Sequence, residues 1–128
     1  IDLLMPHLKV ALQILLFLIF AVGGTYRLFQ PIDALASKML WVSYFDPRIV
    51  RSIALVEVLC GVGLVLPFIF KDLSFDFIFY AGSLLMLTML GAAVTHLVIG
   101  DYKQIFGNVL LLVMAFLVTF PPNQALEG

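Results

Sequence analysis

The sequence predicts an all-α integral membrane protein: a four-helix up-down bundle with a short interfacial helix between its first and second spans. Three observations support this fold class. Apolar residues make up 63% of the 128 residues and charged residues only 12%, whereas soluble domains carry roughly a quarter charged residues. Four apolar runs approach the length of about 20 residues that a helix needs to cross a bilayer. Two of the three links between the runs are short, which makes neighbouring helices antiparallel.

The same composition excludes several classes of soluble protein. A chain of this size has too much surface to hide so many apolar side chains from water. The net charge of −1 argues against a nucleic-acid-binding module, which would need a basic patch. A single cysteine, Cys60, excludes an internal disulfide and a redox pair. We therefore expect one transmembrane domain over residues 1–128, with the lipid bilayer as its environment.

The four predicted spans cover approximately residues 7–26, 47–70, 75–99 and 104–120. The first span is not interpreted as a signal peptide, because no small-residue cleavage site follows its apolar core. The chain opens with Ile1 rather than methionine, so we expect its true start to precede this residue. Tight turns at 71–74 and 100–103 join the last three spans.

The link between the first two spans, residues 28–46, is long enough for an element of its own. Pro31 suits the first turn of a helix, and apolar residues from Ile32 to Val42 recur at helical spacing. Trp41 and Lys38 are residue types that favour the headgroup boundary. We predict an interfacial helix here. The alternative is a loop packed over the bundle.

Up-down topology assigns a depth to each polar residue. We call the side of the membrane where the first span begins side A, and the side where it ends side B. Polar residues from all four spans gather in the side-B half, while the helices offer little on side A beyond Gln13. The predicted ligand-binding polar cluster consists of Arg27, Arg51, Glu57, His96 and Asn108.

Glu57 lies deepest in this cluster, six residues or about 9 Å inside Arg51. An ionisable group in a membrane costs about 2.5–3.5 kcal/mol on insertion scales, so we expect it to face inward and to be paired. Arg51 lies roughly 120° away around the same helix. Arg27 or His96, from other helices, is therefore the better predicted partner.

Small residues surround Glu57 on its own helix. Cys60, Gly61 and Leu64 share its face by helical spacing. Gly61 and Gly63 would let a second helix approach closely. Cys60 is interpreted as a packing residue, because an apolar setting makes a thiol inert.

Each member of the cluster also has a purely structural interpretation. Arg27 and Arg51 could be helix-end anchors, and Glu57 could form a pair that only holds helices together. His96 could donate to a backbone carbonyl, and Asn108 could join two helices. No metal site is predicted, since one histidine and one glutamate make a poor ligand set, and no catalytic motif is visible.

The second span resembles a known family. Arg51 to Gly61, RSIALVEVLCG, followed by Gly63, Leu64 and Pro67, resembles the R-x-I-G-x-x-E-x-x-x-G-x-x-L-x-x-P pattern of DoxX-like membrane proteins. Residues 23–28, GGTYRL, resemble the small-residue, basic end of their first helix, with arginine in place of the usual lysine. Ala54 departs from the pattern, which often has glycine there.

The resemblance covers nearly the whole chain and implies a compact four-helix membrane bundle. His96 with Gly100-Asp101 resembles a eukaryotic branch, the acetylcholine-receptor assembly chaperones called NACHO. Relatives have been linked to thiosulfate:quinone oxidoreductase subunits, to redox-stress membrane complexes, and to receptor assembly or cargo export. Because relatives have such different roles, membership of the family does not decide the function of this chain.

We therefore expect a small multi-pass membrane protein that acts as a ligand-binding or accessory subunit through its polar cluster, and not as an enzyme by itself. The alternative is the membrane subunit of a quinone-linked redox complex, similar to thiosulfate:quinone oxidoreductase. A transporter ranks third, because four spans are few for alternating access without dimerisation. The expected ligand is a quinone or a lipid, and the expected partner is another protein or a second copy.

Basic residues predict the orientation of the bundle. Five lie near side B and two near side A, and the positive-inside rule then favours side B as the cytoplasmic side. The expected location is a bacterial inner membrane or a eukaryotic endomembrane.

Overall fold

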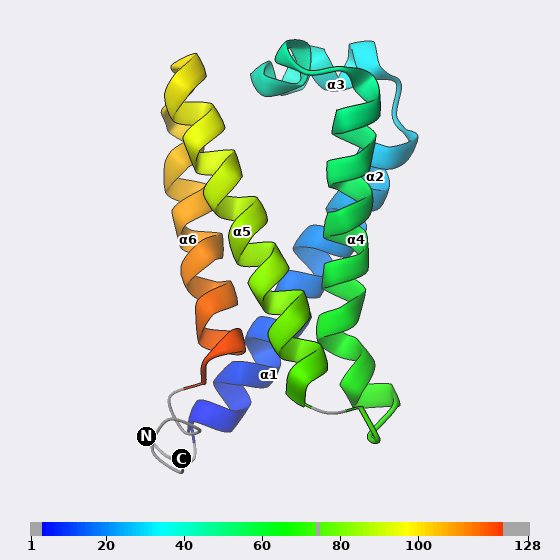
Figure 1. Cartoon of the computed structure of the whole chain (residues 1–128), viewed down its shortest axis with the longest axis vertical. Coiled ribbons are helices and arrows are strands. Elements are labelled where there is room, and N and C mark those ends of the chain that lie inside the picture. Colours follow the sequence, from blue (N-terminus) through cyan, green and yellow to red (C-terminus); the bar gives the residue numbers. More distant parts are fainter. Residues whose placement is uncertain (1–3, 74, 122–128) are drawn as a thin grey trace.

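The computed structural model describes residues 4–73 and 75–121, and its regular elements are all helical. In chain order they are α1 Leu4–Phe17, the π-helical η1 Leu18–Val22, α2 Gly23–Phe29, α3 Ile32–Lys38, the 3₁₀-helical η2 Leu40–Tyr44, α4 Pro47–Ile69, α5 Phe75–Ile99 and α6 Lys103–Thr119. Figure 1 shows them as a bundle with α3 across one end. The predicted fold class, a helical membrane bundle, is confirmed.

Three helical stretches are long and apolar enough to cross a membrane: 6–29, 47–69 and 76–99. The first is a single helical rod, because α1, η1 and α2 follow one another without a break. The fourth helix, α6, has 17 residues, or about 25 Å, so a fourth crossing stays a prediction. Nevertheless, α1 begins and α6 ends at the same end of the bundle (Figure 1), which fits an even number of crossings.

The short helix predicted between the first two spans is present as α3, and a second short helix, η2, follows it in the same link. Met39 separates them with an extended backbone. The sequence that follows, Leu40–Tyr44, contains aromatic and β-branched residues and a serine, which all have modest helix propensity. Leu35 and Val42 are buried together against Val50 of α4, so the segment is anchored to the side-B end of the bundle.

Two local signals determine where the helices beside the site begin and end. The Asp46 side chain accepts a hydrogen bond from the backbone N–H of Arg48 at 2.8 Å, and Pro47 occupies the first turn of α4. This is a standard N-cap. Gly100 ends α5 with a φ of +82°, a conformation that glycine adopts without strain. The turn after α4 is described as far as Leu73, and Ser74 lies outside the described residues.

Glycines allow α4 to pack closely on both neighbours. A Cβ on Gly61 would lie 3.0 Å from the backbone nitrogen of Ala21 in η1. A Cβ on Gly63 would lie 3.2 Å from the Cβ of Ala81 in α5. The prediction that these two glycines permit close helix approach is confirmed.

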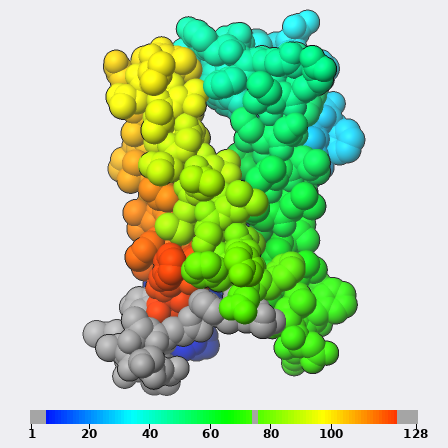
Figure 2. Space-filling view, viewed as in Figure 1, coloured from blue at the N-terminus to red at the C-terminus, as the bar shows by residue number. Residues whose placement is uncertain are grey.

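The helices are tightly packed toward side A and splayed toward side B. The largest apolar core cluster joins residues of η1, α1, α4, α5 and α6, among them Leu16, Leu64, Leu85 and Val118. From there α4 and α5 diverge (Figure 1), and the α3–η2 segment lies over the open end. Figure 2 shows a hollow between the side-B halves of α4 and α5. The site occupies this hollow.

Candidate functional site

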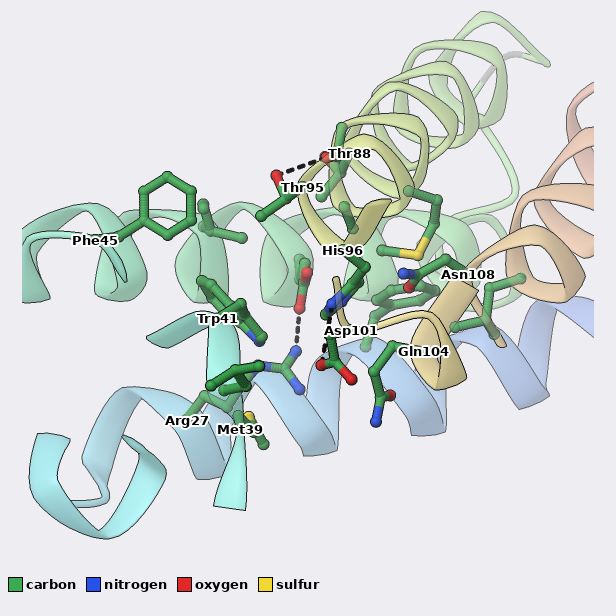
Figure 3. Close-up of a pocket in the computed structure, with 18 of the residues that line it drawn as sticks. Arg27, Met39, Trp41, Phe45, Thr88, Thr95, His96, Asp101, Gln104 and Asn108 are labelled. Carbon is green, nitrogen blue, oxygen red and sulfur yellow. Dashed lines mark hydrogen bonds and ion pairs between the residues drawn. The ribbon is translucent and has the colours of Figure 1, made fainter. Parts of the chain in front are cut away.

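The hollow is a cavity of about 640 Å³ in the side-B half of the bundle. Cavities that bind small ligands typically measure about 300–1,000 Å³. Its lining combines apolar side chains with four of the five predicted cluster residues, Arg27, Glu57, His96 and Asn108. Figure 3 shows Arg27 on one side of the cavity and His96 and Asn108 on the other.

One wall carries an ion pair between α2 and α4. Nη2 of Arg27 donates to Oε2 of Glu57, and Glu57 is buried, with 6% of its surface exposed. The predicted pairing of Glu57 with a cation from another helix is confirmed, and Arg27 is the partner. The pair lies ten residues into α4, about 15 Å from the start of that helix.

The fifth residue of the predicted cluster, Arg51, is not among the residues that line the cavity. Its Nη1 donates to the carbonyl of Arg27 at 2.5 Å and to that of Leu28 at 2.9 Å. These carbonyls belong to the last turn of α2, where backbone acceptors lack helical partners. The 120° rotation from Glu57 directs Arg51 toward this helix end. Arg51 therefore holds the turn that carries Arg27.

The opposite wall contains a second acid–base pair that the sequence interpretation missed. Nδ1 of His96 lies 3.4 Å from Oδ2 of Asp101, without the alignment of a hydrogen bond. Gly100 creates this proximity. Its positive φ turns the chain so that the backbone N–H of Asp101 bonds the carbonyl of His96 at 2.9 Å, as in a Schellman C-cap. A glycine followed by an acidic residue at the end of a predicted helix was the sequence signal that could have indicated this pair.

Two buried nitrogen atoms of this wall have no hydrogen-bond partner among the residues described. They are Nδ1 of His96 and Nδ2 of Asn108. The large majority of buried polar atoms in proteins do have a hydrogen-bond partner, so two buried nitrogens without one in the same cavity are unusual. In the part of the chain that the structure describes, Nδ1 of His96 has only its ionic contact with Asp101. Within the described residues, Nδ2 of Asn108 makes no hydrogen bond between helices.

Small residues and a roof complete the cavity. A strip on one face of α5 lines it with Thr88, Gly91, Ala92 and Thr95. The α3–η2 segment, residues 32–45 with Phe45 directly after η2, forms the roof with five side chains: Lys38, Met39, Leu40, Trp41 and Phe45. The sequence interpretation missed the α5 strip, because small residues in a membrane helix ordinarily indicate helix packing.

The charged groups of the lining are balanced. Arg27 and Lys38 are its basic residues, and Glu57 and Asp101 are its acidic residues, so Arg and Lys match Asp and Glu in number. Nζ of Lys38 donates to the hydroxyl of Tyr26 at 2.9 Å. Within residues 4–73 and 75–121, no three His, Cys, Asp or Glu side chains are grouped as a metal site would require.

The arrangement can hydrogen-bond a polar group and surround an apolar one. Polar groups stand on two facing walls, with Lys38 in the roof, and most of the remaining lining is aliphatic, aromatic or methionine side chains. Such a cavity suits an amphipathic molecule.

A family model described as the DoxX-like family matches residues 11–118 of this chain. The match includes every residue of the cavity, and the chain belongs to the DoxX-like family. No curated protein and no solved structure matches the chain. The family match does not distinguish a branch, so the likeness to the NACHO chaperones stays a prediction.

Proposed function

We propose that this DoxX-like membrane protein is a ligand-binding accessory subunit whose side-B cavity holds a small amphipathic molecule. The observation that carries this proposal is the cavity itself, with its facing polar walls and its two unpaired buried nitrogens. A bound molecule would supply the missing hydrogen-bond partners. The fold class and the family are compatible with this function but do not specify it.

The roof of the cavity offers a link between ligand binding and a protein partner. Trp41 and Lys38 line the cavity from the α3–η2 segment, and Lys38 is also exposed at the side-B end. A ligand that contacts Trp41 would hold this segment in one position. The surface presented to a partner would then depend on occupancy, because a ligand stabilises the conformation to which it binds better.

A plugged cavity tests the proposal. A Cβ added to Gly91 would meet open space, so Gly91→Leu should place a side chain in the cavity without displacing a neighbour. Gly107 of α6 is also exposed, has open space beside it and does not line the cavity. Gly107→Leu is therefore a matched control with the same change in helix propensity.

The measurement is native mass spectrometry of the purified protein in mild detergent. We expect a bound small molecule on the wild type and on Gly107→Leu, and its loss from Gly91→Leu. Equal occupancy of all three proteins, or an empty wild type, would refute the proposed function.

The second candidate function is a quinone-binding subunit of a redox complex. His96 and the Arg27–Glu57 pair line one cavity, which would place hydrogen-bonding groups near the two carbonyls of a quinone ring. Reduction of the ring takes two electrons and two protons, and in this alternative the electrons come from a redox group of a partner subunit.

Chromatography of the extracted ligand separates the two candidates. An isoprenoid quinone that is bound to the wild type and absent from Gly91→Leu would favour the redox alternative. Another amphipathic molecule with this pattern would favour the accessory function.

A further inference from the structure

We infer that the cavity selects an uncharged lipid with an oxygen-bearing end, which enters sideways from the bilayer between α4 and α5. This inference rests on the proposed function, because it names the class of ligand and its route. Three independent features carry it: the direction in which the cavity opens, the unpaired nitrogens inside it, and the charge balance of its walls.

The route follows from the shape of the bundle. The hollow faces the flank of the molecule between the side-B halves of α4 and α5 (Figure 2), while the α3–η2 segment crosses the end. Gly91 lies on the α5 side of the cavity and leaves open space where a side chain would stand. The flank of a membrane protein meets lipid tails. An apolar chain could therefore remain in the bilayer while its polar end occupies the cavity.

The unpaired nitrogens identify the polar end. Nδ2 of Asn108 is an amide nitrogen and can only donate, so its partner must carry an acceptor oxygen. His96 is 93% buried, since 7% of its surface is exposed, and its Nδ1 donates or accepts according to its tautomer. A hydroxyl or carbonyl oxygen near both residues would satisfy them, as their positions in Figure 3 allow.

The charged side chains of the lining disfavour a lipid whose polar end is ionised. The two cations of the lining differ: Arg27 is neutralised by Glu57, whereas Lys38 donates to the uncharged hydroxyl of Tyr26 and lies in the exposed roof. A phosphate beside His96 and Asn108 would face the carboxylate of Asp101, while Arg27 is already paired with Glu57 and Lys38 lies in the exposed roof. Burying a charge without a partner is strongly unfavourable. An uncharged end avoids this penalty.

A competition between two lipids with identical tails tests the selectivity. Dioleoylglycerol ends in a hydroxyl, and dioleoylphosphatidate ends in an ionised phosphate. Native mass spectrometry with both lipids at equal concentration should show roughly tenfold or greater preference for dioleoylglycerol, which corresponds to about 1.4 kcal/mol. Gly91→Leu should abolish this binding, and Gly107→Leu should retain it.

A variant at Asn108 tests the polar contact. Asn108→Leu keeps a side chain of similar size and removes the donor, so dioleoylglycerol occupancy should fall about three- to tenfold, as expected for one lost hydrogen bond. Phe106→Leu alters an exposed residue of α6 outside the cavity lining and should leave occupancy unchanged. A thermal melt of each variant in detergent checks that it is folded.

The outcomes separate this inference from the proposed function. Preferential binding of dioleoylphosphatidate that Gly91→Leu abolishes would overturn the inference and leave the proposed function intact. Unchanged occupancy in Asn108→Leu would overturn the assigned contact. If Gly91→Leu still binds every molecule that the wild type binds, both proposals are overturned.

Discussion

Glu57 shows how one carboxylate can organise the polar half of a membrane bundle. Its pairing with Arg27 ties α4 to α2 and neutralises both charges beside the cavity. Arg51 adds a second tie by donating to the last carbonyls of α2. Three charged side chains thereby position one helix end, and only two of them face the ligand space.

Removing the Glu57 carboxylate should destabilise the protein. Glu57→Ala leaves Arg27 largely buried without a counter-charge, and breaking a buried pair in this way costs about 3–5 kcal/mol. Denaturant unfolding in detergent micelles measures the effect. The double variant Arg27→Met/Glu57→Leu removes both charges and should recover most of the loss. A double variant as unstable as Glu57→Ala would show that packing, and not the unpaired charge, is responsible.

The conservative variant Glu57→Gln should fold but lose its preference for the uncharged lipid. The amide keeps the shape and a hydrogen-bond acceptor, yet the charge of Arg27 is no longer balanced. In the two-lipid competition, the preference should move from dioleoylglycerol toward dioleoylphosphatidate. An unaltered preference would contradict the argument from charge balance.

Asp46 gives a pH-dependent contribution outside the membrane-spanning segments. The backbone N–H of Arg48, followed by the Arg48 side chain, lowers the pKa of the Asp46 carboxyl. A lowered folded-state pKa means that its stabilisation is present above the unfolded value of about 3.9 and is lost as the pH falls through the folded pKa. Asp46→Asn, an equally good N-cap, should melt below the wild type at pH 7, and the two melting temperatures should converge only as the pH falls through the lowered folded-state pKa of Asp46. A constant difference across this range would contradict the assignment.

At the scale of elements, the end of α5 couples backbone conformation to the site. Gly100 adopts a φ of +82°, and this turn places Asp101 beside His96. The first span contains another irregular element, because η1 is π-helical and its residues Ile19 and Phe20 line the cavity. Insertions of this kind in α-helices occur frequently at functional sites.

Replacing glycine by alanine should change the free energy of unfolding in opposite directions at Gly100 and Gly107. Gly100→Ala forces an alanine into the left-handed region, which costs roughly 1–2 kcal/mol, and should loosen the contact between Asp101 and His96. Gly107→Ala lies within a helix with open space around it and should stabilise by up to about 1 kcal/mol. Denaturant unfolding of both variants provides the comparison. Equal shifts would argue against a conformational role for Gly100.

For the whole molecule, the orientation in the membrane is a prediction from charge. Side B carries the larger number of lysines and arginines, which favours a cytoplasmic cavity. We expect Lys103→Cys, in a Cys60→Ala background, to react with a membrane-impermeant maleimide only after the cells are opened. Lys71→Cys, at side A, is the control and should react in intact cells. The reverse pattern would place the cavity on the external side.

The bundle itself could be predicted from the sequence, because a membrane imposes a simple length rule on apolar helices. Composition and four apolar runs were enough to predict the helical membrane bundle. The depth of Glu57 within its run also predicted a pair with a cation from another helix, since an isolated charge there is unfavourable. Gly61 and Gly63 indicated close packing of helices for a similar local reason.

Other features depended on three-dimensional contacts. Helix rotation and packing decide that Arg27 is the cation that pairs with Glu57. They also decide that Arg51 donates to the end of α2 instead. The association of His96 with Asp101 depends on the turn at Gly100, and the cavity on the divergence of α4 from α5 (Figure 1). Hydropathy specifies how long and how apolar a helix is, and in a bilayer this decides that it forms. The pairing of side chains and the space between helices arise only when several helices meet, so the tertiary structure alone decided them.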